Sequence, residues 1–223
     1  EFPETSIHAE VYDLEAYTDE VNKIYAEMET ALLNPDEEGS NPLTIMLRAR
    51  QRTELLKIPL LVDMTKELVE EGRSVVIFVS FRESLRGVVA ALEFQKLGKI
   101  AVIHGDQTDV VREGNVQMFL NDEARVCVTM IQCGGVSIDL DDKRGVYPRV
   151  SLITPAFSAT ELRQALGRIH RATSKSKSVQ RILFAAGTVE EDACRAVNRK
   201  LENLSILLDN ITDRDLMSGI LAD

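Results

Sequence analysis

The sequence predicts an α/β protein, in which helices flank a parallel sheet of about five or six strands and an acidic helical segment precedes the sheet. From Gly72 onward, short apolar runs alternate with amphipathic stretches, which is typical of a parallel sheet. The apolar runs are continuous, as expected of strands covered on both faces. The acidic segment shows in the composition, because residues 1–45 hold twelve acids and only one base, Lys23.

The first 45 residues are expected to form the helical extension. Apolar residues recur at helical spacing over 9–33, from Val11 through Ile24 to Leu32, which predicts one or two amphipathic helices. A loop rich in Pro, Gly and Asn follows at 34–42. Two further helices are expected at 43–55 and 58–71, the second ending before Gly72.

The remainder is predicted to alternate strand and helix. The expected strands are 74–80, 100–104, 125–131, 149–154 and 180–185, and the expected helices are 82–96, 108–121, 159–171 and 189–208. Alternation of this kind predicts right-handed crossovers between parallel strands. Ligands on such sheets lie beyond the carboxyl ends of the strands, so we expect the functional site at that edge.

Composition excludes several classes of protein. Hydrophobic residues at 44% and charged residues at 28% are ordinary for a globular domain. No apolar run approaches the roughly 20 residues of a membrane span, and no signal peptide is evident, so no membrane partner is expected. Three cysteines without C-x-x-C spacing predict neither a zinc site nor a disulfide framework, and indicate an intracellular, reducing compartment.

The net charge of −10 is unlike that of a generic nucleic-acid-binding domain, which is usually basic. The charge is concentrated, however. Of the 36 acids and 26 bases, twelve and one fall in residues 1–45, which leaves 24 acids and 25 bases in a nearly neutral remainder. Such a remainder is compatible with a local strip of contacts to a nucleic-acid backbone, and equally with no such role.

A polar stretch from Gln164 to Arg171 is the strongest indication of a site. Gln164, Arg168 and Arg171 are spaced i, i+4 and i+7, so a helix would align them in one stripe. Ser158 and Glu161 form a capping box that would start this helix after a strand. Two arginines on one face suit a polyphosphate, because guanidinium groups bind oxyanions bidentately. A solvated basic face remains the alternative.

This stretch resembles motif six, Q-x-x-G-R-x-x-R, of superfamily two helicases and translocases. Other segments resemble further motifs of that family in the family's order, most closely in its Swi/Snf-like branch: Val75–Phe81 (motif four), Ile103–Asp106 with Arg112 and Phe119, Thr129–Leu140 (motif five) and Arg181–Glu191. The resemblance covers about residues 45–210 and implies a C-terminal RecA-like lobe over 46–212. Residues 1–45 would then be the end of lobe one or a protrusion, and 213–223 a tail.

The resemblance implies roles for individual residues. Arg171 would act as an arginine finger and Arg168 as a second phosphate contact, with Gln164 beside them. Asp139 and Gly135 would face the nucleotide, Asp139 toward the ribose. The residues implied to contact a nucleic-acid backbone are Ser80, Phe81, Arg82, His104, Gly105, Thr129 and Gly134. No residue of the chain is expected to hold a metal.

The implied cofactors are ATP and Mg²⁺, held mainly by a first lobe. The chain has no G-x-x-x-x-G-K-[ST] loop and no acidic motif for magnesium after a strand, so alone it should hydrolyse ATP very slowly or not at all. The implied partners are the N-terminal RecA-like lobe of the same parent protein and a nucleic acid, with DNA favoured over RNA.

Three departures from the family pattern bear on this assignment. Ser137 stands where Gly is usual, Asp139 stands where the Swi/Snf branch often has Asn, and residues 141–148 form a longer, more charged insert. The alternative reading is a non-catalytic RecA-like interaction module whose acidic extension binds a partner.

Overall fold

Six strands form one sheet in the residues that the computed structural model describes, namely 3–34, 41–132, 138–155 and 159–208. The strands are β1 (Thr5–Tyr12), β2 (Ser74–Val79), β3 (Ile100–Ile103), β4 (Val126–Met130), β5 (Arg149–Ile153) and β6 (Ser178–Ala185). Their order across the sheet is β1-β6-β5-β2-β4-β3, and every pairing is parallel. The predicted parallel sheet is therefore confirmed, with the five expected strands and one more.

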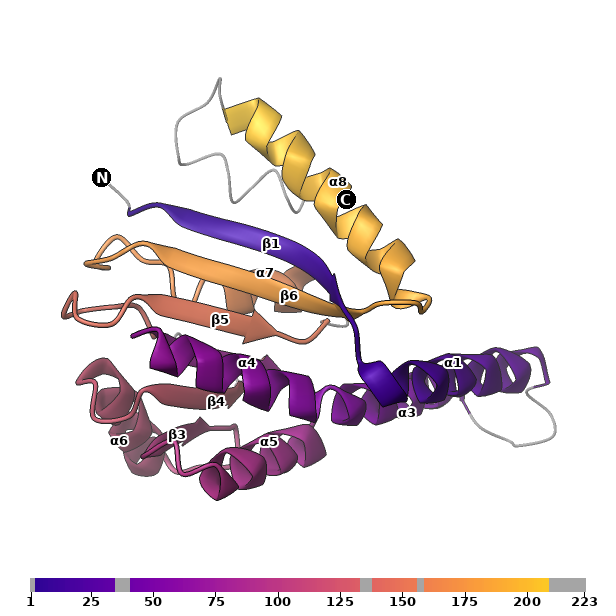
Figure 1. Ribbon diagram of the computed structural model, residues 1–223, viewed down its shortest axis with the longest axis horizontal. Coiled ribbons are helices and arrows are strands. Elements are labelled where there is room, and N and C mark those ends of the chain that lie inside the picture. The colour runs from indigo at the N-terminus through magenta and orange to yellow at the C-terminus, as the bar shows by residue number, and fades with distance from the viewer. Residues whose placement is uncertain (1–2, 35–40, 133–137, 156–158, 209–223) are drawn as a thin grey trace.

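Helices cover both faces of the sheet (Figure 1). They are α1 (Thr18–Leu33), α3 (Pro42–Leu56), α4 (Ile58–Glu70), α5 (Arg82–Phe94), α6 (Asp109–Leu120), α7 (Ala159–Leu166) and α8 (Glu190–Leu208), with a short 3-10 helix at Glu15–Tyr17. Helices α4 and α5 pack on one face of the sheet, and α6, α7 and α8 on the other. The result is a three-layer RecA-like fold.

The strands at the centre are apolar because both of their faces are covered. Every residue of β2 is buried, and its side chains alternate between the two cores: Val76 and Phe78 face α6 and α7, whereas Val75 and Ile77 face α4 and α5. Burial of such side chains contributes roughly 25 cal/mol per Å² of apolar surface removed from water. Continuous apolar runs were therefore a reliable indication of these strands.

Helix starts follow local capping chemistry where the sequence supplies it. Asn41 accepts a hydrogen bond from the Leu43 N–H at 2.9 Å and precedes Pro42 at the first turn of α3. Thr108 caps α6 by accepting from the Val111 N–H at 3.4 Å. Helix α5 has no side-chain cap of its own at Phe81, and its acceptor comes from α3, as described below.

The expectation of helix over 9–33 is wrong for its first part, because residues 5–12 form the edge strand β1. The strand runs parallel to β6 in a register that pairs Thr5 with Ser178 and Tyr12 with Ala185. Polar and apolar residues alternate along Thr5–Tyr12, as in a strand with one open face, and Ala9 is its one buried residue. The helical part of the extension is α1, which lies side by side with α3 (Figure 1).

Candidate functional site

The helix that was predicted to carry Gln164, Arg168 and Arg171 on one face ends before it reaches the two arginines. Helix α7 ends at Leu166, so Gln164 stays on the helix and is exposed, whereas Arg168 and Arg171 lie in the turn that follows. The Arg168 N–H bonds to the carbonyl of Ala165 at 3.1 Å, which is the three-residue spacing of a tightened last turn. The expectation of a helix to 171 is therefore wrong, and the two arginines are held by tertiary contacts instead.

Those contacts come from the segment that resembles motif five. The Leu140 N–H donates to the Arg168 carbonyl at 2.8 Å, and Nη1 of Arg168 donates to the Ile138 carbonyl at 3.2 Å. Between these two bonds, Nε of Arg171 forms an ion pair with Oδ1 of Asp139 at 2.6 Å. We call residues 138–140 with 168–171 the arginine brace. It brings together three of the residues predicted for the nucleotide side: Asp139, Arg168 and Arg171.

Arg171 remains accessible within the brace. Its side chain is 33% exposed and that of Asp139 is 47% exposed. One terminal nitrogen of Arg171, Nη1, lies 3.7 Å from where a Cβ on Gly167 would stand. This is an ordinary van der Waals distance, so the guanidinium of Arg171 lies close to the backbone of Gly167 on the side where a side chain would stand.

The charged insert at 141–148 anchors the far side of the brace. Asp141 and Asp142 are both buried, at 0% and 1% exposure. Asp141 accepts from the hydroxyl of Thr173 at 2.8 Å, and Asp142 accepts from that of Ser176 at 2.7 Å. Asp142 also accepts from the Gly145 N–H at 2.7 Å, in a turn where Gly145 has φ +76°. The insert thus fixes the chain just beyond Arg171.

A buried glutamate from α3, which sequence reasoning missed, lies beside the carboxyl end of β2. Glu54, at the end of α3, is 5% exposed and accepts from the Ser80 N–H at 2.9 Å and the Phe81 N–H at 3.1 Å. It also accepts from the hydroxyl of Thr154, after β5, at 2.6 Å. A negative charge just before the first turn of α5 is favoured by the helix dipole. Glu54 therefore joins α3 to the ends of two central strands.

A second buried charge lies one turn further. Lys57 is 2% exposed, and its Nζ lies 2.5 Å from Oε2 of Glu190 at the start of α8. Burial lowers the pKa of Lys57, and the carboxylate of Glu190 opposes that shift. Glu190 also accepts from the Ala185 N–H at 2.7 Å, so both partners are tied to the end of β6. The sequence indicated this pair only faintly, through a lone lysine within Leu55–Leu61.

The residues predicted for a nucleic-acid backbone lie in different settings. Arg82 is exposed and bonds to Asp106 at 2.7 Å, which connects the end of β2 to the segment after β3. His104 is half-buried and Gly105 is exposed in that same segment. Ser80 and Phe81 are half-buried beside Glu54. These five positions lie along one stretch of the carboxyl edge.

Thr129 does not belong with them. It lies inside β4, paired with Phe78 and Ile103, and is 3% exposed. The strand continues to Met130, so the prediction of Thr129 as a surface contact at the strand end is wrong. Gly134, Gly135 and the capping residue Ser158 lie outside the described residues, and their predicted roles stay predictions.

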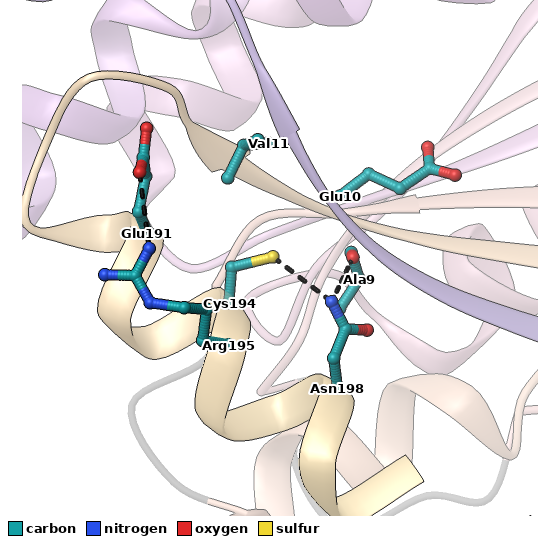
Figure 2. A pocket seen from close by; sticks show the side chains of 7 residues that line it. All are labelled: Ala9, Glu10, Val11, Glu191, Cys194, Arg195 and Asn198. Atoms are coloured by element: carbon teal, nitrogen blue, oxygen red, sulfur yellow. Dashed lines mark hydrogen bonds and ion pairs between the residues drawn. The ribbon is translucent and has the colours of Figure 1, made fainter. Parts of the chain in front are cut away.

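A shallow pocket of about 500 Å³ lies elsewhere, between β1 and α8 (Figure 2). Figure 2 shows Asn198 pointing toward both the Ala9 carbonyl and the sulfur of Cys194, with distances of 2.9 Å and 3.7 Å. Burial raises the pKa of the Cys194 thiol, which favours its neutral form. None of the predicted site residues lines this pocket.

Comparisons with known proteins agree with the fold. The family described as helicase conserved C-terminal domain matches residues 56–173. The chain is 32% identical over 213 residues to the L364 protein of Acanthamoeba polyphaga mimivirus, named for an ATP-dependent RNA helicase activity, covering 94% of this chain and 39% of the relative. It is 30% identical over 141 residues to the DNA excision repair protein ERCC-6-like of Bos taurus, covering 62% and 11%. The chain therefore spans only a part of each relative.

Solved structures share the fold at low sequence identity. The C-terminal part of the Fun30 ATPase domain matches with a TM-score of 0.65 and 14% identity, covering 87% of this chain and 89% of that one. The Sulfolobus solfataricus SWI2/SNF2 ATPase core in complex with dsDNA matches with a TM-score of 0.63 and 16% identity, covering 98% and 47%. Within the described residues, no helix combines the length and apolarity needed to cross a membrane.

Proposed function

Because the chain belongs to the helicase conserved C-terminal domain family, we propose that it is the second motor lobe of an ATP-dependent nucleic-acid helicase or translocase. Its task is to complete the active site with an arginine finger and to hold one strand of nucleic acid by its backbone. Arg171 is the finger, Arg168 the second phosphate contact, and Gln164 lies beside them on α7. Membership of this family does not favour the alternative of a non-catalytic interaction module.

The observation that carries the proposal is the arginine brace. A finger must present a fixed cation to the charge that develops on the transferred phosphoryl group. Arg171 is held by Asp139 at 2.6 Å yet is one-third exposed, so its guanidinium is restrained and still within reach of a phosphate. The residues on either side of Asp139 are bonded to Arg168, so the carboxylate that holds Arg171 is itself fixed in place.

The phosphates and Mg²⁺ would be held by a first lobe of the same protein. With that lobe in place, closure around ATP would bring Arg168 and Arg171 to the γ-phosphate, and hydrolysis would release the lobes, so that lobe motion is coupled to movement along the strand. We further propose that the protein works in a reducing compartment of the cell, as its cysteine content predicts.

The nucleic-acid contacts in this proposal lie along the carboxyl edge. Arg82, His104 and Gly105 would bind the backbone, because an exposed arginine and polar groups at the strand ends suit phosphate oxygens. The Ser80 hydroxyl is buried and the N–H groups of Ser80 and Phe81 are bonded to Glu54, so these two residues would shape this edge without donating from those groups. We propose DNA as the nucleic acid, since the structural relative from Sulfolobus solfataricus was solved with dsDNA. The mimivirus relative is named for RNA. Stimulation of ATP turnover by RNA and not by DNA would therefore overturn this choice.

The test of the finger is Arg171→Ala in the intact protein that carries this lobe. Loss of a finger removes transition-state stabilisation, so turnover of ATP should fall by more than about tenfold while ATP binding stays nearly the same. Arg195→Ala is the matched control, because Arg195 is an exposed arginine on α8 that also pairs with acids. Unchanged turnover in the Arg171 variant, with the control intact, removes the finger assignment.

A further inference from the structure

We propose that Asp139 is a positioning residue: its carboxylate holds Nε of Arg171 so that the two terminal nitrogens of that guanidinium are presented to a phosphate. This rests on the proposed function of Arg171 as the finger. The resemblance implies a different role for Asp139, that of a ribose ligand. The structure supports positioning because the carboxylate is already engaged, at 2.6 Å, by the arginine itself.

The backbone that carries Asp139 is held in place on both sides. Its two neighbours in sequence, Ile138 and Leu140, are 6% and 1% exposed and belong to the hydrophobic core. Both are bonded to Arg168, Ile138 through its carbonyl at 3.2 Å and Leu140 through its N–H at 2.8 Å. The backbone on either side of Asp139 therefore cannot move without breaking core packing.

Arg171 is fixed from its own side as well. Ile169, two residues before it, is fully buried. The Arg171 N–H donates to the hydroxyl of Ser174 at 3.3 Å, and the Ser174 N–H returns a bond to the Arg171 carbonyl at 3.0 Å. Ser174 in turn donates to the buried Asp141 at 3.3 Å. With both backbones fixed, the Asp139 carboxylate restrains the one part of Arg171 that could still turn, its side chain.

The atom used for the contact matters. Asp139 engages Nε, which leaves Nη1 and Nη2, and in the described part of the chain neither of these nitrogens has a hydrogen-bond partner. Nη1 and Nη2 together form the end-on fork that binds two oxygens of a phosphate. An arginine held at Nε thus loses side-chain freedom without losing its fork, which is the arrangement a finger requires.

The ion pair contributes little to folding. Both side chains are substantially exposed, at 33% and 47%, and solvent screens such pairs strongly. Replacing Asp139 should therefore leave the fold intact. Asp139 stands at a position where the Swi/Snf branch often has asparagine, and a carboxylate adds to the hydrogen bond an opposite charge that an amide oxygen lacks.

The experiment uses Asp139→Asn in the intact protein, with steady-state turnover of ATP and of 2′,3′-dideoxy-ATP, which lacks both ribose hydroxyls. Misplacement of a catalytic group by a fraction of an ångström to 1 Å costs up to about a hundredfold in rate, so kcat should fall by at least about tenfold. KM should change far less, and the fall should be the same for both nucleotides. In an Arg171→Ala background, Asp139→Asn should lower kcat no further, because it acts through an arginine that is gone.

Matched controls separate the possible failures. Asp192→Asn removes an exposed aspartate that pairs with an arginine on α8, and its turnover should equal that of the unaltered protein. A loss confined to ATP, with turnover of 2′,3′-dideoxy-ATP unaffected by Asp139→Asn, would identify Asp139 as a ribose ligand and overturn positioning. Unchanged kcat, or an additive loss in the Arg171→Ala background, would also overturn it while leaving the finger standing.

A readout without catalysis tests the pair by itself. In the 223-residue chain, the Nε–H of Arg171 should give an NMR signal with slowed solvent exchange, and Asp139→Asn should abolish that slowing. If Arg171→Ala leaves turnover unchanged, the proposed function fails and positioning falls with it. If the Nε–H exchanges freely in the unaltered chain, positioning fails alone.

Discussion

Two ion pairs in this lobe show how exposure decides what a charged pair does. Arg171 and Asp139 meet at the surface, where the pair adds little stability but sets the direction of a side chain. Lys57 and Glu190 meet in the interior at 2% and 8% exposure, where removing one partner would leave the other as a buried, uncompensated charge. The first pair is suited to function, and the second connects the end of α3 to the start of α8.

The buried pair gives a prediction about stability. Lys57→Met should lower the free energy of unfolding by about 3–5 kcal/mol, because it leaves the carboxylate of Glu190 buried without its cation. Adding Glu190→Gln should recover a large part of that loss, since a neutral side chain can still accept from the Ala185 N–H. Urea denaturation of the unaltered chain and of the two variants measures this, and a double variant less stable than Lys57→Met would contradict the account.

At the scale of elements, the insert at 141–148 determines how the chain beyond Arg171 is held. Its two buried aspartates accept bonds from Thr173, Ser174 and Ser176. A charged insert is usually a solvated loop, but these two carboxylates point inward and organise the neighbouring segment. The insert therefore supports the brace, although it contributes none of the residues proposed to contact a ligand.

This role can be tested with Asp142→Ala. The substitution leaves the Gly145 N–H, the Arg144 N–H and the Ser176 hydroxyl without their acceptor, so unfolding free energy should fall by about 2–3 kcal/mol. Hydrogen exchange should rise first at residues 143–146 and 174–177. Lys177→Ala is the control, because Lys177 and its partner Glu4 are both exposed, and its loss should leave the free energy of unfolding nearly unchanged. Equal losses in the two variants would argue against an anchoring role.

Sequence reasoning succeeded for the elements whose burial can be predicted from a run of neighbouring residues. The strands β2 to β6 were predictable because continuous apolar runs have no other place in a folded chain than between two layers. The strand β1 was missed because its apolar residues, including Val11, also fit helical spacing, and its open face carries polar side chains. Periodicity does not separate these two cases in a short segment.

The residues of the candidate site could be picked out from the sequence, but the contacts that hold their side chains could not. The i, i+4, i+7 spacing picked out Gln164, Arg168 and Arg171, yet it implied a continuous helix, whereas tertiary bonds from 138–140 hold the arginines in a turn. Glu54 and Lys57 were not identified as buried, because polar residues on a helix ordinarily face solvent. Their partners, Ser80, Thr154 and Glu190, are distant in sequence, and only the fold brings them together.

At the scale of the whole molecule, the acidic helix α1 lies beside α3 and packs against the end of β6, whereas the proposed nucleic-acid contacts follow β2 and β3. Helix α1 packs near the end of β6, where Asn22 donates to the carbonyl of Gly187 at 2.9 Å (Figure 1). Arg82 and His104 follow β2 and β3, which belong to the other half of the strand order. The acidic extension would repel phosphates from its own end and so direct a nucleic acid toward the β2, β4 and β3 end.

The measurement that tests the central claim most directly is the ATP turnover of the intact protein with duplex DNA, single-stranded DNA and RNA in turn, each with and without Arg171→Ala. If this chain is a second motor lobe, DNA should stimulate turnover more than RNA does, and the alanine variant should lose nearly all of the stimulated rate. Stimulation by RNA alone would reverse the choice of nucleic acid. Turnover that no nucleic acid raises, and that Arg171→Ala leaves intact, would contradict the assignment of this chain as a motor lobe.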